Sequence, residues 1–139
     1  MQKILVALDL DDTASFKRLS SAAESLSEAE SEIHYLCVVP DFGMSIVGSY
    51  FSEEHEQSVL QAAREQLQQM ISGLDSQRLN KGHIAQGTVY DQIILTAKNL
   101  QCDVIVIGAH KPGLHNYLLG TNAARVARHA TQSVFVSRD

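Results

Sequence analysis

Residues 103–136 read DVIVIGAHKPGLHNYLLGTNAARVARHATQSVFV, and this stretch decides the fold that the sequence predicts. The apolar run at 104–107 stops at Gly108, as expected of a strand that is buried on both faces. After a loop, Gly120 and Thr121 open an alanine-rich helix. A strand, a glycine loop and a helix N-terminus in this order offer free backbone N–H groups to a phosphate. A nucleotide site is therefore the first hypothesis.

Outside this stretch, hydrophobic periodicity predicts strands that alternate with helices along the whole chain. The strands are predicted at residues 3–9, 32–40, 81–86, 103–108 and 133–137. The helices are predicted at residues 12–27, 53–74, 88–100 and 121–129. Asp11 and Asp12 are expected to cap the first helix, and Thr88 with Asp91 resembles a capping box at the start of the third.

Strands that are separated by helices imply parallel pairing with right-handed crossovers. The sequence therefore predicts an α/β fold in one domain, residues 1–139. Its single doubly wound sheet has five parallel strands in the order 3-2-1-4-5, with four helices on both faces. Ligands of such sheets bind where the strand order reverses, which here lies between the first and fourth strands. That reversal would bring Asp9 next to Gly108.

The composition of the chain limits the kinds of partner that it is expected to bind. The 139 residues are 45% hydrophobic and 19% charged, as in an ordinary globular protein. A formal net charge of -5 and a pI of about 5.6 argue against sequence-independent binding to nucleic acid or to an anionic membrane. No apolar stretch is long enough to span a bilayer. The first residues run directly into an apolar strand without a small-residue cleavage site, so we expect a cytoplasmic chain.

Catalytic and metal-binding patterns are weak in this chain. Cys37 and Cys102 lie within or beside apolar runs and are expected to be buried thiols. The histidines lack zinc-ligand spacing, and no Ser-His-Asp or Cys-His set can be assembled from residue order. Hydrolysis of a nucleotide needs groups that orient water and hold magnesium, and only Asp9 and its neighbours qualify. We expect no efficient enzyme, and at most slow ATP hydrolysis.

The chain resembles the universal stress protein family over its whole length. The resemblance rests on the opening KILVALD at residues 3–9, on LCVVP at 36–40, on Gly87 and on the closing SVFV at 133–136. Members that bind ATP carry a glycine, two residues, a second glycine, nine residues and then Gly-Ser or Gly-Thr. Gly108 matches the first glycine and Gly120-Thr121 match the final pair.

The middle of the glycine pattern differs from the family. Lys111 stands where the second glycine belongs, Pro112 follows it, and the loop is one residue shorter. Ala7 also replaces a proline that is often seen in the family. The stretches 110–112 and 117–123 are similar to a branch of short, single-domain bacterial members.

The resemblance implies an adenine-nucleotide site with ATP, with or without Mg²⁺, as the ligand. It implies that Asp9 lies near the ribose and adenine, that the backbone of Val38 meets the adenine edge, and that Ile107 and Gly108 form the floor under the ribose. The residues implied near the phosphates are His110 and Lys111 in the loop and Gly120, Thr121 and Asn122 at the helix N-terminus.

Each of these residues has a plainer interpretation when it is taken alone. Gly108 and Gly120 could be turn glycines, and Thr121 could be only a helix N-cap. Asp9 could be a strand-end carboxylate in solvent, and Lys111 an exposed loop lysine. The apolar loop at residues 42–51 could close over a ligand or pack against a partner.

The last strand carries Val134, Phe135 and Val136, and an apolar strand at the edge of a sheet invites pairing. The resemblance implies an antiparallel homodimer through this strand, with an unknown regulatory protein as a further partner. The function that follows is regulatory binding of an adenine nucleotide in a stress response. The alternative is a nucleotide-free dimeric interaction protein of the same fold. A nucleotide-processing enzyme would need a signature such as Ser-Gly-Gly after the first strand, which residues 8–11 lack.

Overall fold

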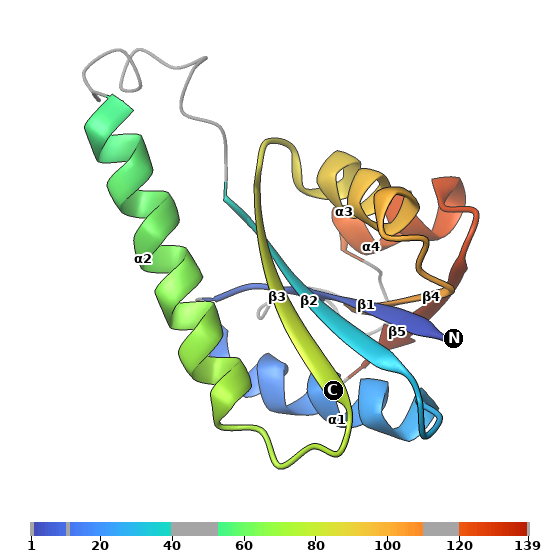
Figure 1. Cartoon of the computed structure of the whole chain (residues 1–139). Helices are drawn as coiled ribbons and strands as arrows, with labels where there is room; N and C mark the ends of the chain where they lie inside the picture. Colours follow the sequence, from blue (N-terminus) through green and yellow to red (C-terminus); the bar gives the residue numbers. More distant parts are fainter. Residues whose placement is uncertain (1, 11, 40–52, 110–119, 139) are drawn as a thin grey trace.

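The computed structural model describes residues 2–10, 12–39, 53–109 and 120–138, and Figure 1 shows its arrangement. The described residues form five strands and four helices that alternate along the chain. The strands are β1 (Lys3–Leu8), β2 (Glu32–Val39), β3 (Leu79–Gln86), β4 (Val104–Gly108) and β5 (Ser133–Ser137). The helices are α1 (Thr13–Leu26), α2 (Glu53–Ser72), α3 (Val89–Asn99) and α4 (Thr121–His129).

The five strands pair in parallel in the order β3-β2-β1-β4-β5, which confirms the predicted sheet. Strand β1 lies at the centre, and its residues Ile4, Leu5 and Val6 are fully buried. The strand is apolar from Ile4 to Leu8 because helices cover both faces of the sheet. The strand order reverses between β1 and β4, as the pattern predicted.

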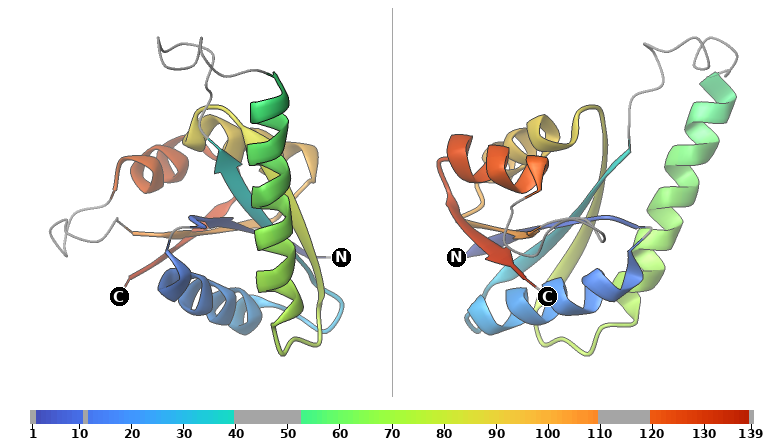
Figure 2. Two further views of the ribbon diagram at one scale, coloured as in Figure 1. Left: turned by 90° about the vertical axis from the view of Figure 1, so that its left-hand side faces the viewer. Right: turned by 180° about the vertical axis from the view of Figure 1, so that it is seen from behind.

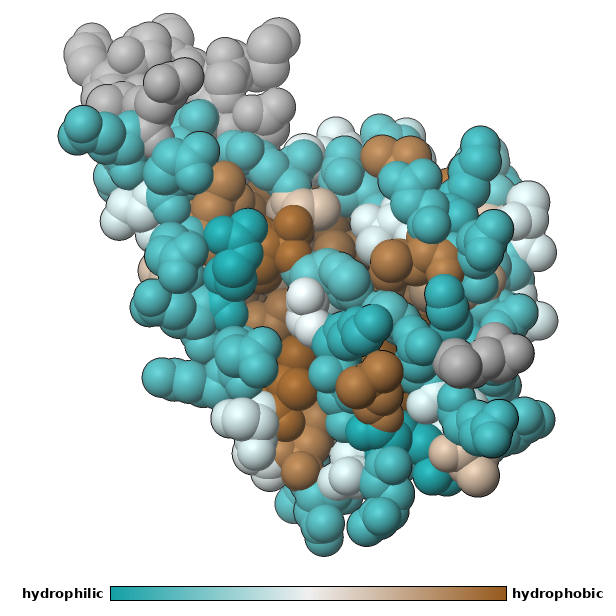
Figure 3. All heavy atoms as spheres, viewed as in Figure 1, coloured by the Kyte–Doolittle hydropathy of each residue, from teal (hydrophilic) through white to brown (hydrophobic). Residues whose placement is uncertain are grey.

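Each face of the sheet buries its own apolar cluster. The views from two directions agree that α1 and α2 cover one face, and α3 and α4 the other (Figure 2). Phe16 and Leu67 belong to the first cluster, while Ile93 and Val126 belong to the second. Alternation along each strand divides its side chains between the two clusters. A band of apolar surface follows β3 where it borders α2 (Figure 3).

The starts of α1 and α3 test the helix-capping signals that the sequence predicts. Asp12 caps α1 as predicted, since its carboxylate accepts a hydrogen bond from the Ser15 backbone N–H at 3.2 Å. The predicted capping box at Thr88 was wrong, because the Thr88 side chain makes no capping bond among the described residues. The chain enters α3 through Gly87, whose φ of 140° few other residues tolerate and whose N–H donates to the Val39 carbonyl at 3.0 Å.

Strand β3 begins at Leu79, two residues before the predicted start. Leu79 and Asn80 have no alternating apolar pattern, yet they pair in register with Glu32 and Ile33 of β2. Backbone pairing with a neighbouring strand therefore extends β3 beyond the segment that its side chains indicate. The expected caps at Asp11 and the apolar loop at residues 42–51 lie outside the described residues.

The two cysteines, Cys37 and Cys102, are buried thiols that form no disulfide, as expected. Burial raises the pKa of the Cys102 thiol to about 11, so this thiol is neutral at physiological pH. Among the helices of the described ranges, none combines the length and the apolar character that crossing a bilayer requires.

Candidate functional site

A cavity of about 830 Å³ opens at the carboxyl ends of β1, β2 and β4, where the strand order reverses. Its floor comes from the strand ends, and its walls come from all four helices. Helix α2 contributes the apolar residues Val59, Ala62 and Ala63 and the polar Gln66. This is the position at which doubly wound sheets bind ligands, and the volume falls in the usual range for small-molecule sites.

The cavity brings together seven of the residues that the sequence singled out. They are Asp9, Val38, Ile107, Gly108, Gly120, Thr121 and Asn122. Asp9 follows β1 directly and is exposed, while the end of β4 beside it is partly or fully buried. His110 and Lys111, also predicted for the site, lie outside the described residues.

Helix α4 points its N-terminus at this cavity, and Thr121, Asn122 and Ala123 line the wall there. The N-cap residue is Gly120, with φ −63° and ψ 158°, so the interpretation of Thr121 as the N-cap is wrong. Glycine has no side chain to donate or accept, and in the described part of the chain no side chain caps this end. The first N–H groups of a helix have no intrahelical acceptor, so α4 presents unsatisfied donors and the positive end of its dipole to the cavity.

A backbone hydrogen bond holds α4 against the end of β4. The Gly120 N–H donates to the Ala109 carbonyl at 2.5 Å, and the Ala124 N–H donates to the Gly120 carbonyl at 2.9 Å. The first of these bonds brings the end of β4 and the start of α4 together. The glycines predicted to flank the site, Gly108 and Gly120, therefore lie close together.

Arg18 is a lining residue that the sequence analysis missed. It comes from α1, is half-buried, and brings its Nη2 atom to 3.8 Å from the position that a Cβ atom would take at Gly108. Arg18 follows Phe16 and precedes Leu19, two buried residues of α1, so periodicity alone gives it no special meaning. Its place in the cavity depends on how α1 packs against β4, which is a tertiary contact.

The cavity carries two described carboxylates, Asp9 and Asp12. The second is engaged at the N-terminus of α1 through Ser15. Groups of three or more His, Cys, Asp or Glu side chains suited to a metal ion are absent among the described residues.

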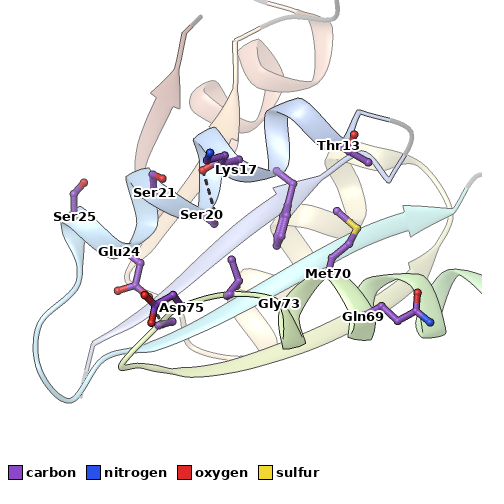
Figure 4. A pocket seen from close by; sticks show the side chains of 13 residues that line it. Thr13, Lys17, Ser20, Ser21, Glu24, Ser25, Gln69, Met70, Gly73 and Asp75 are labelled. Atoms are coloured by element: carbon purple, nitrogen blue, oxygen red, sulfur yellow. Dashed lines mark hydrogen bonds between the residues drawn. The ribbon is translucent and has the colours of Figure 1, made fainter.

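A second cavity, of about 910 Å³, lies between α1 and the carboxyl end of α2 (Figure 4). Serines and Lys17 line its α1 side, and Phe16, Met70 and Leu74 provide its apolar surface. Its described lining residues come from α1, α2 and the segment that follows α2, and none comes from the strand ends at which the strand order reverses. It has neither a helix N-terminus without a side-chain cap nor a strand end among its described lining residues, so we place the candidate site in the first cavity.

The parallel sheet in the order 3-2-1-4-5, with a cavity at the reversal point, defines a doubly wound α/β protein. The model of the universal stress protein family matches residues 1–138, and the chain belongs to this family. A curated relative, universal stress protein G of Shigella flexneri, is 32% identical over 139 residues, which cover 97% of each chain. The corresponding protein of Salmonella typhimurium is 30% identical with the same coverage.

Solved structures share the fold. The hypothetical protein MJ0577 aligns with a TM-score of 0.80 at 22% identity, covering 99% of this chain and 96% of that one. A universal stress protein family protein of Arabidopsis thaliana with AMP bound aligns with a TM-score of 0.56 at 21% identity, covering 100% and 93%. A universal stress protein in complex with cAMP aligns at 0.59 and 16% identity, covering 99% and 97%.

Proposed function

We propose that this chain binds ATP or a related adenine nucleotide as a regulatory ligand in a stress response. Binding, and not efficient turnover, would be its activity, and Mg²⁺ would enter with the triphosphate. The observation that carries the proposal is the N-terminus of α4, which opens without a side-chain cap from the described residues into the cavity at the strand-order reversal. Unsatisfied N–H donors and a positive dipole end favour a phosphate at that position.

The remaining lining supports a nucleoside next to the phosphates. Asp9 follows β1 with an exposed carboxylate that could accept a hydrogen bond from a ribose hydroxyl. Ile107 and the half-buried Val38 offer apolar and backbone surface for a flat base. The two family structures that contain AMP and cAMP support adenine as the base. We extend the proposal to His110 and Lys111 as loop residues near the phosphates.

We also propose a homodimer that forms in the cytoplasm through β5, with a regulatory protein as a further partner. Strand β5 is an edge strand of the sheet, and the Phe135 side chain is 40% exposed on it. Val134 and Val136 pack against the second cluster, on the opposite face of β5 from Phe135. An exposed apolar edge strand is a template for pairing.

The proposed site is tested by melting the protein with Mg-ATP, Mg-ADP and AMP, and by mass analysis of nucleotide released on denaturation. A ligand that binds only the folded state at 100 times its Kd stabilises it by about 2.7 kcal/mol. We expect ATP to raise the melting temperature of the wild-type protein by several degrees.

Gly120→Asp provides the variant that separates binding from folding. An aspartate at this extended N-cap position would accept the free N–H groups of α4 itself, so the ligand-free protein should be at least as stable as wild type. Its negative charge and its occupied donors should abolish stabilisation by ATP. Gly120→Ser is the matched control, because serine caps without adding charge, and it should retain part of the shift. Absence of bound nucleotide and of any shift at millimolar ligand would favour the nucleotide-free interaction protein.

A further inference from the structure

Charge is distributed unevenly among the described residues of the candidate site. Arg18 is the one cationic side chain that lines the cavity within the described ranges, whereas Asp9 and Asp12 are both anionic. Asp12 accepts the capping hydrogen bond of α1, and Asp9 is exposed where β1 ends. A ligand phosphate near Asp9 would meet repulsion, and a cation in the same cavity would offset it.

Arg18 reaches the end of β4, in the same cavity that the start of α4 lines. Its Nη2 atom is 3.8 Å from the Cβ position of Gly108, which is an ordinary van der Waals contact. Gly108 precedes Ala109, whose carbonyl accepts the hydrogen bond from the Gly120 N–H at the start of α4. The guanidinium and the free N–H groups of α4 therefore border one cavity from opposite elements, with the end of β4 between them.

Position 108 faces the guanidinium of Arg18 at an ordinary contact distance. Its Cβ direction points to the α1 face of the sheet, because Val104 and Val106 before it pack into the first cluster. A side chain there would contact the guanidinium and fill the space between Arg18 and the strand end.

We infer that Arg18 is a specificity-determining residue that makes the site prefer a nucleoside phosphate over the uncharged nucleoside. The inference rests on the proposed nucleotide site and deepens it. A guanidinium is always charged and presents a planar set of donors that match phosphate oxygens, so it adds affinity only where the ligand carries phosphate. Adenosine makes the same contacts to the strand ends but carries no phosphate, so its affinity would not depend on Arg18.

The test is calorimetric titration of ATP, AMP and adenosine into wild-type, Arg18→Met and Arg18→Lys proteins. Methionine keeps most of the side-chain length and its packing on α1 without the charge. We expect Arg18→Met to weaken ATP about tenfold or more, to weaken AMP less, and to leave adenosine within about twofold of wild type. Arg18→Lys should recover part of the ATP affinity, since it restores charge without the bidentate geometry.

Lys17→Met is the matched control. Lys17 is the neighbour of Arg18 on α1 but lines the second cavity, so its removal changes the net charge equally without touching the candidate site (Figure 4). ATP affinity in Lys17→Met should equal that of wild type. Circular dichroism and ligand-free melting verify that each variant is folded, and Arg18→Gln replaces Arg18→Met if the latter does not fold.

Two outcomes overturn the inference. Equal loss of ATP and adenosine in Arg18→Met would mean that Arg18 only maintains the shape of the cavity. Unchanged ATP affinity in that variant would mean that the guanidinium does not reach the phosphates. Wild-type protein that binds none of the three ligands would refute the proposed function itself, and so differs from both results.

Discussion

The imidazole rings of His34 and His83 stack across β2 and β3, with His34 Nδ1 2.8 Å from His83 Nε2 and the ring centroids 5.1 Å apart. The other nitrogen of His34 lies 3.0 Å from Glu32 Oε1. The hydrogen bond from His34 holds the pKa of Glu32 below its usual value, so this carboxylate is ionised and accepts the bond at neutral pH. Neutral His34 then accepts at Nδ1 from the N–H of His83.

This pair predicts a dependence of stability on pH. Burial lowers the pKa of both His34 and His83 below the ordinary value of 6.5. Lys81 and Lys3 lower the pKa of His34 further, while Glu32 opposes the shift. The unfolded chain therefore binds more protons than the folded chain below about pH 6.5, and the free energy of unfolding should fall as the pH decreases through this window.

Urea denaturation between about pH 8 and pH 5 measures this effect. We expect His83→Gln to flatten the dependence on pH, because one of the two depressed groups is removed. His129→Gln is the control, since His129 is exposed at the end of α4 and its loss should leave the slope unchanged. A slope that is identical in wild type and in His83→Gln would contradict the prediction.

Tyr35 predicts a stabilising substitution. Its side chain is fully buried, packs edge-on against Phe16 with ring centroids 5.5 Å apart, and its hydroxyl has no hydrogen-bond partner among the described residues. Burial, with a smaller contribution from Glu24, raises the pKa of the hydroxyl above its usual value. We expect Tyr35→Phe to stabilise the fold by about 1 kcal/mol, because an unsatisfied polar group leaves the core. Urea denaturation measures the change in the free energy of unfolding. Tyr90→Phe is the control, because Tyr90 is half-buried, and it should leave the stability unchanged. A loss of stability in Tyr35→Phe would reveal a partner for the hydroxyl.

A second stabilising substitution is expected at Gln101, in the turn that ends α3. Gln101 adopts a φ of 58°, a conformation that is strained for a residue with a Cβ atom. The two hydrogen bonds of a Schellman motif hold it in this conformation. The Gln101 N–H donates to Lys98 at 3.1 Å and the Cys102 N–H donates to Ala97 at 2.9 Å. We expect Gln101→Gly to stabilise the protein by about 0.5–1 kcal/mol in thermal unfolding. Gln101→Ala keeps the strained backbone and should show no such gain; equal stability of the two variants would argue against strain at this position.

The proposed dimer predicts a different effect at each edge of the sheet. Phe135→Glu on β5 should convert the dimer to a monomer in sedimentation velocity, because like charges would face each other across the two-fold axis. Leu79→Glu is the matched control on the opposite edge strand, where the Leu79 side chain is 55% exposed, and it should leave the dimer intact. If Leu79→Glu alone dissociated the dimer, the interface would lie at β3 and not at β5.

Local sequence patterns determined the kind and order of the elements, because apolar runs, helical periodicity and terminating glycines act on a few neighbouring residues. They also determined the parallel sheet, since helices between consecutive strands allow only a crossover connection. The meeting of Asp9 with Gly108 in the cavity follows from that topology, whereas most of the other candidate site residues were named from the resemblance to the family.

The tertiary structure alone decided the contacts that depend on register and on helix rotation. His34 meets His83 because β2 pairs with β3 so that Leu36 lies opposite His83, and no property of either strand by itself specifies that register. Arg18 enters the cavity because α1 packs against β4 at one rotation, and the start of α4 meets the end of β4 because the Gly120 N–H bonds to the Ala109 carbonyl. Contacts between residues far apart in sequence are set by the packing of whole faces, which no local window contains.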